Sequence, residues 1–143
     1  RALKDFSKYI QLTESSGRRE DLLIRAQAQS QMAELLAAGP DELPRDAEAA
    51  LELLDVAETY LTLELGKPQV DRGRIELILM SARESVAAAL AEGGDFASAI
   101  AYTQDEILGA LDLDLPAHRF VEKENRFRLE KYYTKNKPFR LVE

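Results

Sequence analysis

The sequence contains no cysteine and a single histidine, His118, and these absences remove several kinds of functional site at once. Without thiolates there is no disulfide, no thiolate zinc site and no cysteine nucleophile. One histidine cannot build a histidine-rich metal site. We therefore predict no metal centre and no cofactor. A chain without cysteine is also consistent with an intracellular protein, cytoplasmic or nuclear.

Long apolar runs are missing as well, so the sequence predicts no membrane-spanning segment and no membrane partner. The first residues lack the charged-then-apolar pattern of a secretory signal. The chain begins at Arg1, already within a helical pattern, and not at a methionine. We expect it to be part of a larger parent protein.

Proline and glycine stand mostly at the ends of periodic apolar stretches, which leaves the interiors of those stretches free to be helical. No stretch alternates with a period of two, and valine, isoleucine and threonine are sparse, which argues against a sheet. The sequence predicts an all-α fold, with one helical domain over 1–134 and an extended tail over 135–143. The expected helices cover about 2–14, 19–38, 44–65, 70–92, 95–113 and 116–133.

A glycine pair followed by an aspartate, Gly93-Gly94-Asp95, marks the clearest turn of the sequence. Glycine supplies the left-handed conformation that ends one helix, and Asp95 can cap the start of the next. Small residues such as Ala99 follow, which suits two helices that pack closely. The pattern predicts a helical hairpin in which Ala99 is buried.

The helical stretches also repeat weakly along the chain. Residues 46–51 align with 95–100 at an offset of 49, and residues 32–39 align with 86–93 at an offset of 54. Residues 94–102 and 111–116 resemble the second helix and closing proline of the tetratricopeptide repeat family, and 63–70 is similar to the linker of its long-helix variety. The resemblance covers about 19–133.

This resemblance implies stacked antiparallel helical hairpins, a fragment of an α-solenoid. A plain helical bundle, or a piece of another kind of α-solenoid, would bury the same apolar faces and stays open as an alternative.

Charge is distributed unevenly along the chain. The net charge is −7, but residues 117–143 carry eight basic and four acidic residues, a balance of +4 that leaves −11 for the rest. An acidic body argues against nucleic acid as a partner, because phosphate contacts need a basic face. Glu48, Glu52, Glu58 and Glu64 are expected to form a solvated face of one helix.

The sequence shows no motif for catalysis. It has no phosphate-binding glycine loop and no serine in a strand-to-helix turn. Nothing marks a pair of carboxylates as buried or placed in a cleft, and His118, in a first helical turn, is expected to lie at the surface or to cap. We predict that the protein is not an enzyme.

Stacked hairpins make surfaces that hold peptides or helices of other proteins. We therefore predict a protein–protein interaction module of a larger scaffold or adaptor. The alternative is an acidic assembly chaperone for a basic client such as a histone. The resemblance implies that the first helices, 19–38 and 70–92, line a groove, and Arg25, Gln29 and Arg83 are our candidates for a polar stripe in it.

These three residues can equally be ordinary exposed positions. In the last helix, Phe120 and Phe127 are candidates for an aromatic interface, and Tyr132 with Tyr133 for an edge that packs on a following repeat.

Overall fold

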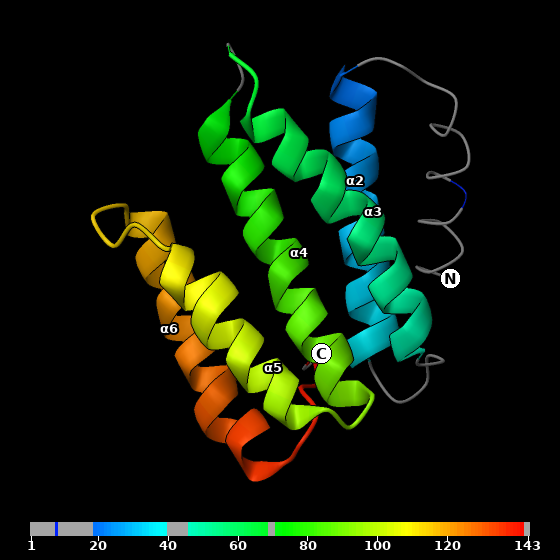
Figure 1. Cartoon of the computed structure of the whole chain (residues 1–143), viewed down its shortest axis with the longest axis vertical. Coiled ribbons are helices and arrows are strands. Elements are labelled where there is room, and N and C mark those ends of the chain that lie inside the picture. Colours follow the sequence, from blue (N-terminus) through cyan, green and yellow to red (C-terminus); the bar gives the residue numbers. More distant parts are fainter. Residues whose placement is uncertain (1–7, 9–18, 40–45, 69–70, 142–143) are drawn as a thin grey trace.

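Five α-helices pack side by side, and no strand occurs within residues 8, 19–39, 46–68 and 71–141, which are those that this computed structural model describes. Consecutive helices run in opposite directions, so three of them point one way and two the other (Figure 1). The helices are α2 (Arg19–Ala38), α3 (Ala47–Leu65), α4 (Arg72–Glu92), α5 (Phe96–Tyr102) and α6 (Pro116–Lys131). The all-α prediction is confirmed, while the helix expected over 2–14 lies outside the described residues except for Lys8, which is helical.

Aspartates set the starts of three helices. Asp46, Asp71 and Asp95 each accept the backbone N–H three residues further on, at 3.0–3.1 Å, and so satisfy a donor that the helix leaves unpaired. The cap at Asp71 lets α4 begin at Arg72 even though Gly73 follows at once. Gly94 has a φ of 88°, the left-handed conformation that the predicted turn requires.

The core lies around α4, which packs against α2 and α3 on one side and α5 on the other. Leucines of α3 such as Leu54 and Leu61 are fully buried, and alanines fill the close approaches between helices. Ala99 of α5 is also fully buried, which confirms its predicted position. None of the described helices combines the length and apolar character that crossing a membrane requires.

The fifth helix is shorter than the predicted helix over 95–113. After Tyr102 the chain widens into a π-helical turn, η1 (Thr103–Ile107), and then tightens into a 3₁₀ turn, η2 (Leu108–Ala110). The buried hydroxyl of Thr103 donates to the carbonyl of Ala99 at 2.8 Å, where the widening begins. Periodicity does not reveal such a turn, because the π turn inserts into an otherwise continuous apolar pattern.

The chain after α6 folds back onto the other helices. A short turn, η3 (Tyr133–Lys135), leads into a segment without regular structure. The Phe139 ring is buried in it, and the backbone N–H of Leu141 donates to the carbonyl of Ala38 at 2.8 Å. Tyr133 was predicted to lie at an exposed edge. It is completely buried, which corrects that expectation.

Two polar residues expected at the surface are buried. Glu64, assigned to a solvated face, is only 2% exposed. Its burial is compensated by a hydrogen bond from the Tyr60 hydroxyl at 3.0 Å and an ion pair with Lys67 at 2.7 Å. His118 is buried as well, and its Nδ1 accepts the backbone N–H of Asp112 at 2.9 Å. His118 therefore neither lies at the surface nor caps α6, but ties the loop before this helix to its first turn.

Candidate functional site

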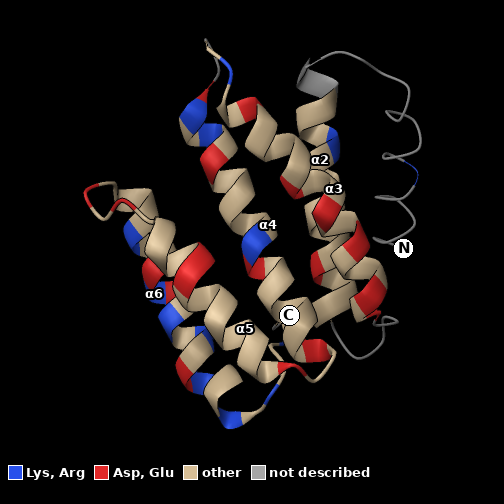
Figure 2. Ribbon diagram, in the orientation of Figure 1, with Lys and Arg blue, Asp and Glu red and all other residues tan. Residues whose placement is uncertain are grey.

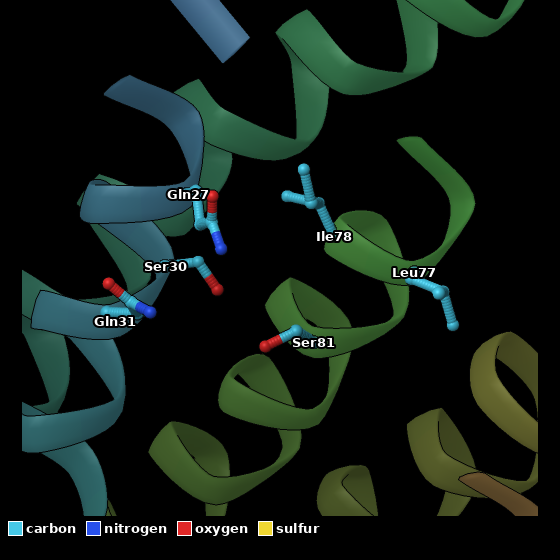
Figure 3. A pocket seen from close by; sticks show the side chains of 6 residues that line it. All are labelled: Gln27, Ser30, Gln31, Leu77, Ile78 and Ser81. Atoms are coloured by element: carbon cyan, nitrogen blue, oxygen red, sulfur yellow. The ribbon is translucent and has the colours of Figure 1, made fainter. Parts of the chain in front are cut away.

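A polar pocket lies between α2 and α4, which run side by side in the same direction (Figures 1 and 3). Its volume is about 170 Å³. Four of its six lining residues are polar, and we call it the polar pocket, although apolar atoms contribute most of its open surface. The lining residues are Gln27, Ser30, Gln31, Leu77, Ile78 and Ser81.

Ser30 is the most informative of these residues. It is 2% exposed, and its hydroxyl finds no hydrogen-bond partner among the residues that the structure describes. Figure 3 shows the hydroxyls of Ser30 and Ser81 directed from their two helices toward the same gap. Because a buried hydroxyl without a partner costs free energy, such a group marks a place where a ligand can supply the missing bond.

Hydroxyls and carboxamides both donate and accept hydrogen bonds. The two serines, with Gln27 and Gln31 at the rim, can therefore pair with the N–H and C=O groups of a peptide backbone. Leu77 and Ile78 add apolar surface beside them. This mixture fits a peptide better than it fits a nucleotide or a metal ion. The described residues hold no group of three or more side chains placed to ligate a metal.

Carboxylates continue the same faces of α2 and α4 about one turn beyond the pocket. Glu34 lies on α2 and Glu84 on α4, and both are near the guanidinium of Arg128 on α6. The Glu84 carboxylate accepts from Asn125 Nδ2 at 2.6 Å. Arg128 also pairs with Glu124 at 3.3 Å. Three carboxylates thus share one buried guanidinium.

Burial dominates the electrostatics of this cluster. It raises the pKa of Glu34 and of Glu84 above their ordinary values, and the charge of Arg128 only partly offsets this effect. Glu124 raises the pKa of both further through like-charge repulsion. The cluster holds more negative than positive groups, so a second cation brought by a ligand would be attracted to it.

The C-terminal segment holds Arg128 in place. The Phe139 ring lies under the guanidinium, with 3.9 Å between the guanidinium carbon and the ring centroid. Arg140 pairs with Glu92 of α4 at 2.8 Å and anchors the segment. Burial raises the pKa of the neighbouring Tyr133 to about 12, so this phenol stays neutral.

The residues predicted for the polar stripe do not line this pocket. Arg25 is half-buried, Gln29 is buried, and Arg83 donates to the carbonyl of Glu106 at 2.9 Å and faces Glu58 at 3.7 Å. The correction follows from helix geometry. Positions two apart, such as Ser81 and Arg83, differ by about 200° around the helix axis and face opposite ways.

The offset between the two predicted repeats also relates polar residues in and beside the pocket. Gln27 and Ser81 are related by the same offset of 54 residues that aligns the two predicted repeats, and so are Ser30 and Glu84. The pocket lies between the two helices predicted to line a groove, 19–38 and 70–92, but Arg25, Gln29 and Arg83 are not among its lining residues. The polar residues that line the pocket interrupt helical stretches that are otherwise rich in alanine.

The aromatic candidates lie on α6 and at its end. Phe120 is 71% exposed and Phe127 is 45% exposed, so neither ring is buried in the core. Tyr132 is half-buried and makes edge contacts with Phe127 and Phe139, at centroid distances of 6.1 Å and 5.2 Å. Phe120 and Phe127 form a second surface, separate from the polar pocket.

The chain matches no protein-family model, no curated protein and no solved structure.

Proposed function

We propose that the protein is a non-enzymatic protein–protein interaction module, of the kind found in scaffolds and adaptors, which binds an extended peptide of a partner between α2 and α4. The unpartnered Ser30 hydroxyl is the observation that carries this proposal. An extended peptide has free backbone N–H and C=O groups to offer such a hydroxyl. A helix pairs these groups internally and has none to offer along its length.

We also propose the tetratricopeptide-like architecture, with α2–α3 and α4–α5 as stacked hairpins and α6 as a further first helix. Its support is the packing of α4 against both helices of the preceding pair, and the shared direction of α2, α4 and α6. In this arrangement the first helices line one surface, where the polar pocket and the carboxylate cluster lie.

The bound peptide carries a lysine or arginine in this proposal. Its backbone pairs with Ser30 and Ser81, and its cationic side chain reaches Glu34 and Glu84 one turn further along the groove. The long stems of lysine and arginine cover about this distance. The incoming charge offsets the excess of carboxylates around Arg128.

The carboxylate cluster also favours a second candidate, the acidic chaperone for a basic client. The two candidates differ in how binding responds to salt. Attraction that rests on many exposed charges weakens steeply as salt is added, whereas hydrogen bonds to a buried pocket do not. A steep loss of affinity with salt would favour the chaperone.

A random-peptide library displayed on phage tests the proposal with a defined probe. The wild-type protein should enrich peptides that contain lysine or arginine, and synthetic copies of those peptides should bind in a fluorescence titration. Ser81→Leu fills the pocket and should weaken their binding at least tenfold. Thr59→Leu, an equally apolar change at an exposed position of α3, is the matched control.

Enriched peptides that bind Ser81→Leu as tightly as wild type would contradict the site. A library that yields no enriched sequence would contradict the function. A circular dichroism melt of each variant separates a lost site from a lost fold.

A further inference from the structure

The two ends of the row of helices carry surfaces of opposite charge, and neither surface belongs to the peptide pocket. At one end, a groove of about 410 Å³ opens between α2 and α3. Val56, at its edge, is 53% exposed. The volume lies within the range of clefts that hold apolar groups. The lining residues are Met32, Leu36, Ala49, Glu52, Leu53 and Val56.

Acidic residues flank this groove along α3. Glu48, Glu52 and Asp55 are exposed, and α3 contains no lysine or arginine between Ala47 and Leu65. Figure 2 shows acidic positions spaced along α3, while basic positions are most frequent along α6, at the other end of the row. The groove therefore combines an apolar floor with a negative edge.

The outer face of α6 has the complementary character. Phe120 and Phe127 are exposed to solvent, and exposed Arg119, Lys123 and Arg126 run beside them. Arg126 pairs with Glu122 of the same helix at 3.3 Å, and exposed Glu130 lies on the same side, so the three basic residues leave this face a net charge of only +1. An exposed apolar patch bordered by charge is typical of a protein interface.

The spacing of the two surfaces agrees. Phe120 and Phe127 are seven residues apart, about 10.5 Å along a helix axis, and Ala49 and Val56 in the groove have the same separation. In both helices a charged residue directly precedes the apolar one, as at Asp55–Val56 and Arg126–Phe127. The acidic residues of α3 and the basic residues of α6 therefore lie on the same side of the apolar residues of their own helix. When two such helices pack antiparallel, the acidic side of one faces the basic side of the other.

We propose that a second copy of this chain is the partner for these surfaces: the outer face of α6 in one copy docks into the α2–α3 groove of the next. Helices α3 and α6 run in opposite directions in the chain, so two copies placed side by side in the same orientation make this contact antiparallel (Figure 1). The contact is head-to-tail, so an assembly of any length keeps a free groove at one end and a free α6 face at the other. A symmetric contact between two α6 faces would instead oppose like charges.

Two variants separate a head-to-tail contact from any symmetric one. Phe120→Ser with Phe127→Ser removes the α6 face, and Val56→Arg blocks the groove with bulk and a repelling charge. All three positions are exposed, so the fold should survive. In sedimentation velocity, wild type should gain mass with concentration, and each variant alone should stay a monomer.

Mixing the two variants is the decisive measurement. The first keeps an intact groove and the second keeps an intact α6 face, so the mixture should form a species of twice the chain mass and nothing larger. High salt should weaken it, because the contact joins opposite charges. Leu113→Ser, which removes an exposed leucine outside both surfaces, should associate like wild type.

A wild-type chain that stays monomeric at every concentration overturns the proposal, and so does a mixture that stays monomeric while wild type associates. A groove occupied by residues 1–18 of the same chain, or by a different protein, gives the first of these results. Ser81→Leu should leave self-association unchanged, so the failure of this contact and the failure of the peptide site are separate outcomes.

Discussion

Replacing Ser30 by alanine should make the protein more stable while it weakens peptide binding. The substitution removes a buried hydroxyl that has no partner among the described residues, and leaving such a group unpaired costs about 1–3 kcal/mol. Alanine is also the better helix former, by up to about 0.5 kcal/mol. A small void where the oxygen stood offsets part of the gain.

The net expectation is a rise of about 1–2 kcal/mol in the free energy of unfolding. For a chain of this length it corresponds to about 3–6 °C in the melting temperature.

The matched control is Ser85→Ala, one helix away. Ser85 is fully buried too, but its hydroxyl donates to the carbonyl of Ser81 at 3.2 Å, so alanine loses a bond there. Thermal melts and urea titrations of both variants should place Ser30→Ala above wild type and Ser85→Ala at or below it. If Ser30→Ala melts at a lower temperature than wild type, the Ser30 hydroxyl does not destabilise the folded protein, and the proposed site loses its main support.

Three further substitutions test other parts of the structure. Ala99→Leu should overpack the contact between α4 and α5 and cost about 1–3 kcal/mol in a urea titration, and an unchanged midpoint would refute the close packing. Glu84→Gln should keep the bond from Asn125 and melt higher than wild type at neutral pH. The folded state raises the pKa of Glu84, so wild type loses stability as the pH rises above the ordinary value of 4.5, and the advantage of glutamine should vanish in melts below that pH. Gly94→Ala should cost about 1 kcal/mol because of its φ of 88°, whereas Gly93→Ala, with a φ of −76°, should cost clearly less, and equal costs would contradict the turn.

The helix ends were predictable because their chemistry is local. An aspartate that caps and a glycine that takes a positive φ act within three or four residues, and both are legible in the sequence around Asp46 and Gly94. The same holds for the start of α6 at Pro116. Such signals need no knowledge of what the helix packs against.

It was harder to predict which side of each helix faces the core and which side faces a groove or the solvent. In α2, alanines are buried on more than one side, so the apolar pattern is too broad to fix which polar residues face a groove. Ser30 and Gln29 are neighbours, both are buried, and only the three-dimensional packing tells that Ser30 lines the pocket. Glu64 was misplaced for a similar reason, since Tyr60 and Lys67 compensate its burial and look like surface residues in the sequence.

The return of the C-terminal segment to α2 bears on how the protein folds. Arrays of helical hairpins hold mostly neighbour-to-neighbour contacts and can form unit by unit. Here the hydrogen bond between Leu141 and Ala38 joins positions about a hundred residues apart in the sequence, and Arg140 forms an ion pair with Glu92 of α4. A segment that follows all five helices in the sequence thus completes the packing of α2. We expect unfolding to be a single cooperative transition, and not a fraying from either end.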